Sequence, residues 1–263
     1  MKKICCFATV LLCMSFVVCN SASAQKNPDR EYYKIVIYHY KTADQEKQLD
    51  QYLENALLPA LHRQKVADVG VFKPLANDTA ADKQLYMFMP FKSLKDMAGV
   101  DADVKNDKSY QAAGTSYINA VYDNPPYTRL ETIIIYAFSM APKMQLPQLK
   151  AAANERVYEL RSYESATEKI FANKVHMFNE GGEVPLFKRL NFNAVFYGEV
   201  VAGSKMPNLM YMTTFENMAD RDAHWKSFGE DAEWKQLSAK PEYQKNVQHI
   251  DIIFLRPTTY SDF

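Results

Sequence analysis

The sequence predicts an α+β protein built from one β-α-β-β-α-β unit that occurs twice in tandem. A β-branched and aromatic run at Tyr32–Tyr40 opens the first unit, and helical and strand-like segments then alternate up to Phe138. The same order of patterns returns about 123 residues later, from residues 156–163 onward. A repeat of this length is a domain and not a solenoid module. Units of this order form ferredoxin-like sandwiches, in which four antiparallel strands carry two helices on one face.

The first unit contains four strand patterns and two helical regions. The strand patterns occupy Tyr32–Tyr40, Val66–Leu75, Gln84–Phe91 and Arg129–Phe138. Apolar residues at helical spacing predict a helix over residues 43–64, with Pro59 kinking it near its end. A broken helix is expected over residues 92–121, because Gly99 and Gly114 interrupt it. The Ile-rich fourth strand is expected to be central in its sheet.

The second unit follows after a connector. We assign residues 31–138 to the first repeat, 139–154 to a linker that can hold a short helix, and 155–257 to the second repeat. The alignment places Tyr163 on Tyr40. Each four-stranded sheet needs cover on the face without helices, and the duplicate can supply it. We therefore predict that the two sheets pack face to face into one pseudo-two-fold α+β barrel.

The first 24 residues have the pattern of a secretory signal peptide. Two lysines precede an apolar run over residues 4–18, and small residues then lead to Ala24. The apolar run is shorter than the roughly 20 residues that a spanning helix needs. We therefore expect cleavage near Ala24/Gln25 and a periplasmic or secreted protein. A lipid anchor on Cys19 is the alternative, although Val18 is bulkier than the residue that usually precedes such a cysteine.

Composition narrows the classes of partner. All four cysteines lie in the first 24 residues, so the mature chain is expected to lack disulfides, thiolate metal sites and a cysteine nucleophile. The 31 basic and 31 acidic residues form no basic stripe, which argues against a nucleic-acid partner. No later apolar run is long enough to span a membrane. The 17 tyrosines and 15 phenylalanines suit a core or a pocket for a small apolar or aromatic ligand. Homo-oligomer formation is left open.

Three segments of the second half resemble the NIPSNAP family. Residues 157–163 (VYELRSY) are similar to its opening strand, and residues 184–189 (VPLFKR) resemble its helix-ending segment. Residues 219–234 resemble its D-R-x-x-x-W…D-x-E-W helix signature. The matches occur in order and cover most of Arg156–Arg256. The resemblance implies a fold of the dimeric α/β-barrel superfamily, which contains cofactor-free monooxygenases, haem enzymes and binding proteins, so activity must be argued from the site.

The first half resembles the family only through the internal repeat. It has Tyr38 where the strand arginine would stand, Tyr110 in place of Trp234, and no counterpart of Arg221. We therefore expect the second half to carry the working pocket.

Alternation along the strand at residues 157–163 places Glu159, Arg161 and Tyr163 on one face. Arg161 and Tyr163 can hold an acidic ligand, and the corresponding face of the first half offers Tyr38 and Tyr40. The alternative is an ion pair between Glu159 and Arg161 that satisfies both charges between the two sheets.

The helix signature adds a second group of candidates. Arg221, His224 and Trp225 share one helix face, and His224 can act as a donor or an acid/base near neutral pH. Ordinary packing of an amphipathic helix is the alternative explanation. With the strand residues, this group predicts a pocket lined by tyrosines, Arg161 and the helix that carries Trp225.

The sequence predicts no metal site and no cofactor. His176 and Glu180 are four residues apart, which lets both face one ion, but no third ligand accompanies them. Nothing selects one of the five histidines as a haem ligand. No P-loop, G-x-S-x-G, H-E-x-x-H or EF-hand motif is present.

These observations leave three functions open. The leading hypothesis is a non-enzymatic module that binds a small molecule in a discrete pocket. The second is a cofactor-independent monooxygenase or isomerase that uses Tyr and His as proton carriers. The third is a protein-interaction module with an exposed apolar patch. Whether the protein is an enzyme is not decided by the sequence.

Overall fold

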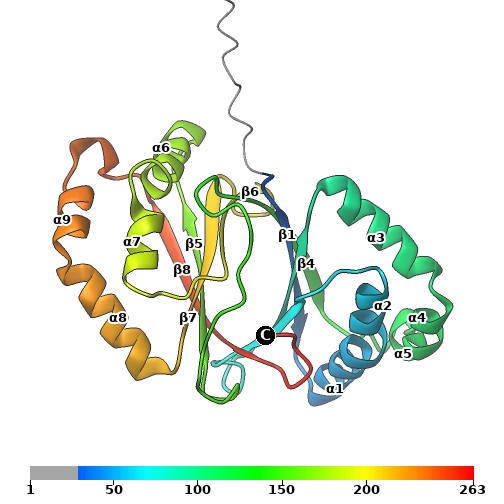
Figure 1. Cartoon of the computed structure of the whole chain (residues 1–263). Coiled ribbons are helices and arrows are strands. Elements are labelled where there is room, and N and C mark those ends of the chain that lie inside the picture. The colour runs from blue at the N-terminus through cyan, green and yellow to red at the C-terminus, as the bar shows by residue number, and fades with distance from the viewer. Residues whose placement is uncertain (1–28) are drawn as a thin grey trace, which may run out of the picture.

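The computed structural model describes residues 29–263, and the predicted signal peptide, residues 1–24, lies outside this range. Eight strands close into one barrel, and helices cover two opposite sides of it (Figure 1). The strands are β1 (Tyr32–Tyr40), β2 (Gly70–Pro74), β3 (Lys83–Phe91), β4 (Arg129–Ala137), β5 (Val157–Glu164), β6 (Phe196–Ala202), β7 (Asn208–Phe215) and β8 (His249–Pro257). Within residues 29–263, no helix combines the length and the apolar character needed to cross a membrane.

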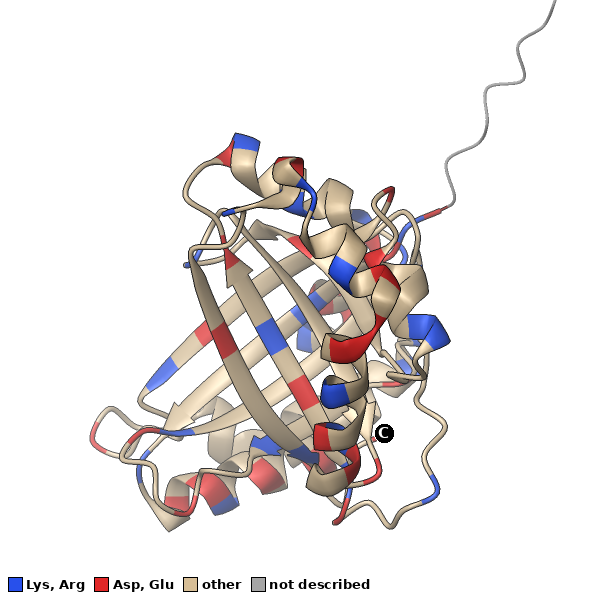
Figure 2. Ribbon diagram, turned by 90° about the vertical axis from the view of Figure 1, so that its left-hand side faces the viewer, with Lys and Arg blue, Asp and Glu red and all other residues tan. Residues whose placement is uncertain are grey.

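The helices form one group for each repeat (Figure 1). The first group comprises α1 (Ala43–Tyr52), the π-helical turn η1 (Leu53–Leu57), α2 (Leu58–Arg63), α3 (Leu94–Asn106), α4 (Lys108–Ala113) and α5 (Thr115–Ile118). The second comprises α6 (Glu168–Phe178), α7 (Glu183–Arg189), α8 (Met218–Glu230), α9 (Ala232–Ser238) and the 3₁₀ turn η2 (Pro241–Tyr243). On the side that Figure 2 shows, acidic and basic residues are interspersed along the helices.

Each repeat supplies four neighbouring strands of the barrel. The order is β1-β3-β2-β8-β5-β7-β6-β4, and each neighbouring pair is antiparallel. The predicted tandem ferredoxin-like repeats and their barrel are therefore confirmed. The two sheets also join edge to edge, through β2–β8 and β4–β6, because this pairing satisfies the backbone groups that an open edge would leave exposed. One chain thus completes the barrel.

The position of strand β4 in its sheet differs from our expectation. Its Ile-rich sequence suggests a central strand, but β4 is the outermost strand of its own repeat and pairs across the junction with β6. Gly198 of β6 permits this close approach, because a Cβ there would lie 2.4 Å from Cγ2 of Ile135. Barrel closure, rather than a central position, buries Ile135 completely.

The helix predicted over residues 43–64 is present but is not regular. Thr42 caps it, accepting a hydrogen bond from the backbone N–H of Gln45. The π-helical turn η1 precedes Pro59, which lacks the N–H that a regular helix would use at that position. The linker at residues 139–154, whose sequence left room for a short helix, contains none.

The core has three layers. One apolar cluster fills the barrel, and one further cluster lies between the barrel wall and each helix group. Inside the barrel, one end is packed with large aromatic rings: Phe88 lies 5.0 Å from Phe196, and Phe72 lies 4.9 Å from Tyr158. Phe263 closes this end against Phe72. These rings occupy only this end of the barrel, and a cavity lies toward the other end.

Candidate functional site

Glu159, Arg161 and Tyr163 do share one face of β5, but this face is turned toward the helices. Tyr163 belongs to the cluster under the helices of the second repeat, while Tyr158 and Leu160 belong to the barrel interior. Our expectation of an ion pair between the two sheets was therefore wrong in its location. Alternation along a strand separates the two faces, but only the folded barrel shows which face is inside.

The carboxylate of Glu159 is the centre of this buried group. It is completely buried and accepts hydrogen bonds from Arg161 Nε (2.6 Å) and from Arg221 Nε (2.8 Å). The indole N–H of Trp225 also donates to it, at 2.8 Å. The guanidinium of Arg161 lies over the Trp225 ring, 3.7 Å from its centroid. Five of the predicted site residues therefore meet here when Tyr163 is included.

Tyr163 extends the network to a second tyrosine. Its hydroxyl accepts from Arg161 Nη1 at 3.0 Å and lies 2.7 Å from the hydroxyl of Tyr211. Burial raises the pKa of Tyr211 well above its ordinary value, and the nearby Tyr163 raises it further, so Tyr211 stays protonated. The charged groups here satisfy one another, which is the behaviour of a buried network that fixes α8 against the barrel.

The remaining predicted site residues do not join this network. His224 is directed to the backbone, with Nδ1 2.9 Å from the carbonyl oxygen of Asp220. Tyr38 and Tyr40 lie under the helices of the first repeat, on the opposite side of the barrel. Tyr40 accepts a hydrogen bond from Asn77, whereas Tyr38 lines a cavity of about 310 Å³ in that layer. The structure therefore does not bring the tyrosines of the first half and Arg161 into one pocket.

A different cavity lies inside the barrel, at the end opposite the aromatic rings. We call it the barrel-end cavity; its volume is about 310 Å³. Seven strands and the β6–β7 loop supply its lining, which consists of Ile37, Gln84, Tyr86, Arg129, Glu131, Ile133, Leu160, Ser162, Val200, Gly203, Ser204, Lys205, Asn208, Met210, Asp251 and Ile253. The interior-facing alternation of strands places these residues around one space.

The lining of the barrel-end cavity combines apolar and polar side chains and includes one polar group that is incompletely bonded. Asn208 is buried, and its Nδ2 donates to Ser162 Oγ at 2.9 Å. Its other side-chain atom, Oδ1, has no hydrogen-bond partner among the described residues. A buried acceptor without a partner costs about 1–3 kcal/mol. A ligand or water that donates to Oδ1 would remove this cost.

Charged side chains form the rim of the cavity. Glu131 lies 2.7 Å from Arg129 Nη2 and 2.7 Å from Nε2 of the buried His39. On the other side, Lys205 pairs with Asp251. Partial burial alone would raise the pKa of Asp251, but hydrogen bonds from Lys205 and His249 outweigh it and lower the pKa, so the carboxylate is ionised at neutral pH.

Tyr86 is the phenol inside the cavity. Burial raises its pKa, and nearby Glu131 and Asp251 raise it further, so Tyr86 is a proton donor at neutral pH. Its hydroxyl donates to Gln84 Oε1 at 2.7 Å. Sequence reasoning missed this set of residues. The available signal was polar residues at alternate positions near strand ends, but these positions are far apart along the chain.

The fold shows which structural class this protein belongs to. Two ferredoxin-like repeats, one closed eight-stranded barrel and helices outside it make this a protein of the dimeric α/β-barrel type, with both halves of the barrel in one chain. Residues 158–262 match the sequence model of the NIPSNAP family. The second half of the chain is therefore a NIPSNAP domain, as its motifs suggested.

Two solved structures of low sequence identity support the fold. A candidate monooxygenase from Lactobacillus acidophilus NCFM is 13% identical, with a TM-score of 0.57 over 87% of this chain and 94% of that one. Another, from Fusobacterium nucleatum, is 7% identical, with a TM-score of 0.57 over 88% and 93%. A NIPSNAP family protein from Agrobacterium tumefaciens strain C58 is 17% identical and covers 44% of this chain and 98% of that one, with a TM-score of 0.37. Comparison with curated proteins yields no match.

Proposed function

We propose that this protein is a non-enzymatic binding module that holds a small organic molecule in the barrel-end cavity. The observation that carries the proposal is the unpartnered Oδ1 of Asn208, a buried residue in the lining of this cavity. Binding sites for small molecules commonly combine apolar walls with a few placed polar groups. A volume of about 310 Å³ fits a small ligand.

The lining restricts the chemistry of the ligand. Ile133, Leu160 and Met210 provide contacts for an apolar or aromatic body. Asn208 Oδ1 requires a donor, such as a hydroxyl or an amine, on the part of the ligand that enters deepest. The ion pairs of Arg129 with Glu131 and of Lys205 with Asp251 at the rim favour a polar group at the outer end.

Native mass spectrometry of the protein purified from its own host tests this proposal. The native mass should exceed the denatured mass by that of one small molecule. Val200→Phe fills the barrel-end cavity and should abolish the difference. Val36→Phe is the matched control, because Val36 lines the separate cavity beside Tyr38, under the helices of the first repeat. This variant should retain the molecule. Retention by Val200→Phe would contradict the proposal, and loss by Val36→Phe alone would move the ligand to the other cavity.

A cofactor-independent monooxygenase or isomerase is the second candidate. The fold is similar to that of two candidate monooxygenases, and Tyr86 supplies a protonated phenol in the cavity. Incubation of the identified ligand with oxygen would distinguish the candidates. An enzyme should convert the ligand, with a strong loss of rate in Tyr86→Phe, whereas a binding module should return it unchanged. A protein that carries no molecule from its host would favour a protein-interaction module.

We also propose that the protein is periplasmic or secreted. The support is the pattern of the first 24 residues, with two lysines, a short apolar run and small residues up to Ala24. Cell fractionation with N-terminal sequencing should find a soluble chain that begins near Gln25. An uncleaved chain in the cytoplasm would contradict this. Homo-oligomer formation stays a prediction, which light scattering of the purified protein can test.

A further inference from the structure

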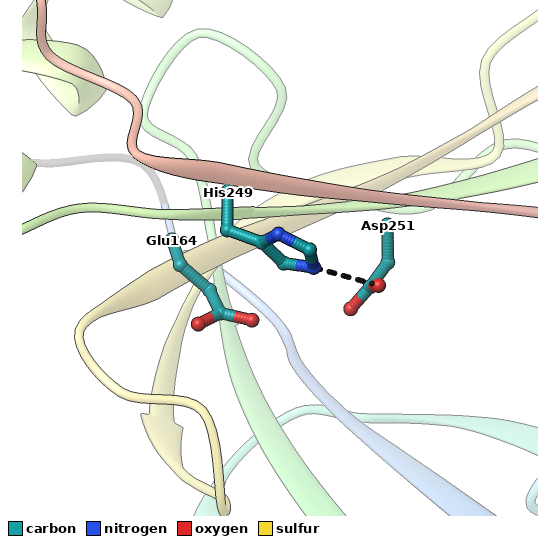
Figure 3. A group of neighbouring side chains, drawn as sticks. All are labelled: Glu164, His249 and Asp251. Atoms are coloured by element: carbon teal, nitrogen blue, oxygen red, sulfur yellow. Dashed lines mark hydrogen bonds and ion pairs between the residues drawn. The ribbon is translucent and has the colours of Figure 1, made fainter.

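Three potential metal ligands meet at the rim of the barrel. Glu164 ends β5, and His249 lies directly opposite it on β8. Asp251 follows two positions after His249, so its side chain projects from the same face of the strand. Ligand atoms of all three residues lie within 4.8 Å of one another. Figure 3 shows the two carboxylates on either side of the imidazole, on one side of the sheet.

We propose that Glu164, His249 and Asp251 form a binding site for a divalent transition-metal cation such as Zn²⁺. One imidazole nitrogen and two carboxylate oxygens are ligands that Zn²⁺ accepts, at about 2.0–2.2 Å. Ligands at these distances lie within roughly 4.2 Å of one another around the ion, so small side-chain rotations bring the observed atoms into range.

The charges of this cluster favour a cation. His249 Nε2 lies 3.1 Å from Asp251 Oδ1, and Lys205 neutralises Asp251 from another side. Glu164 is bonded to neither of the other two residues of the cluster (Figure 3). Two carboxylates against one ammonium leave the cluster with a net negative charge when His249 is neutral. A divalent cation would compensate this charge and compete with Lys205 for Asp251.

The site is open, and it borders the barrel-end cavity. Three protein ligands leave at least one coordination position for water or another ligand, as in zinc sites that act on small molecules. Asp251 belongs to both the cluster and the cavity lining. The cation site therefore lies at the edge of the cavity. Cation binding here requires no organic ligand in the cavity, because the three side chains and their charges suffice for it.

Two of the three ligands have a recognisable spacing in the sequence. His249 and Asp251 are separated by one residue on a strand, so both face the same side. The third ligand, Glu164, is 85 residues away along the chain, and only the pairing of β5 with β8 brings it opposite His249.

Isothermal titration of Zn²⁺ into the metal-free, untagged protein tests the site. We expect saturable binding of one ion per chain. His249→Ala and Asp251→Asn should each weaken binding by at least about tenfold, since loss of even an outer-shell partner has an effect of that size. His62→Ala is the matched control: His62 also pairs with a carboxylate, Asp262, at 2.9 Å. This variant should bind as the wild type does.

Two further variants make the result specific. Lys205→Met removes the competing ammonium and should strengthen Zn²⁺ binding, which a merely adventitious surface histidine would not show. Val200→Phe fills the cavity but leaves the three ligands intact, so it should bind Zn²⁺ normally and thereby separate this inference from the proposed organic ligand. Absence of saturable binding, or equal affinity in wild type and His249→Ala, would overturn the inference.

Discussion

The guanidinium of Arg161 lies 3.7 Å over the ring of Trp225, and both side chains donate a hydrogen bond to the same buried carboxylate. This relationship joins β5 to α8. Arg221 of α8 donates to the same carboxylate, that of Glu159. The residues that give the second half its NIPSNAP signature thus connect the barrel wall to its helix layer.

The first prediction concerns the centre of this network. Glu159→Ala leaves two guanidinium groups without their buried partner, and breaking such a pair costs about 3–5 kcal/mol. Urea denaturation should show this loss in the free energy of unfolding. Arg161→Met should cause a loss of similar size, because it leaves Glu159 with one cationic partner fewer.

An exposed carboxylate provides the control for this prediction. Glu233 also pairs with an arginine, Arg189, at 2.8 Å, but its side chain is 57% exposed. Glu233→Ala should therefore change the free energy of unfolding by no more than about 0.5 kcal/mol. Equal effects of Glu159→Ala and Glu233→Ala would show that the buried network does not stabilise the fold.

The second prediction compares two aromatic residues in the same layer. Phe187 is 1% exposed and packs against Phe228 at 4.9 Å, so Phe187→Ala should cost about 3–5 kcal/mol. Trp234 is larger, but it is only partly buried. Trp234→Ala should cost less, roughly 1–2 kcal/mol, because part of the indole contacts water in the folded state. Chemical denaturation measures both; the reverse order would contradict this packing.

The third prediction concerns the junction between the repeats. A methyl group at Gly198 would lie 2.4 Å from Ile135 Cγ2 and 2.7 Å from the carbonyl oxygen of Tyr136. Gly198→Ala should therefore destabilise the β4–β6 pairing by about 1–3 kcal/mol. Thermal unfolding should show the lower midpoint.

The control for the junction is another glycine. Gly99 lies inside α3, where a Cβ would meet no atom within 4 Å. Gly99→Ala should stabilise the protein by about 0.5–1 kcal/mol, since alanine loses less backbone freedom than glycine on forming a helix. If Gly198→Ala stabilised the protein as much as Gly99→Ala, β4 and β6 would not approach each other as closely as the structure shows.

The fourth prediction is a pH dependence. Glu183 is buried beside Lys174, with Nζ 2.9 Å from Oε2. Burial raises the pKa of Glu183, while Lys174 lowers it, and burial prevails. Lys174→Met removes the opposing effect, so the folded-state pKa of Glu183 should rise further. A raised pKa stabilises the fold only below the unfolded value of about 4.3, and this contribution is lost as the pH rises through the folded pKa.

The destabilisation caused by Lys174→Met should therefore be larger at neutral pH than below pH about 4. Urea denaturation at both pH values measures it. Lys188→Met is the control, because Lys188 is an exposed lysine of the neighbouring α7. It should show no such difference between the two pH values. If Lys174→Met lowered the free energy of unfolding equally at both pH values, burial would not raise the pKa of Glu183 in the folded protein.

The order of elements could be predicted from the sequence because each helix and strand has a local residue pattern of its own. The run Tyr32–Tyr40 forms β1 with those bounds, and its counterpart in the second half forms β5. Strand alternation also grouped Glu159, Arg161 and Tyr163 correctly, since side chains along a strand alternate by geometry alone. Because the unit is duplicated, each sheet can cover the open face of the other, and this predicted the barrel.

Tertiary structure alone decided which face of each strand lies inside the barrel. Both faces of β5 carry buried residues, so hydrophobicity could not distinguish the interior from the helix layer. The barrel-end cavity and the cluster of Glu164, His249 and Asp251 depend on pairings between distant strands. Local patterns record which residues face the same way along one strand. Which strands become neighbours is determined by closure of the whole barrel, because only closure pairs every strand edge.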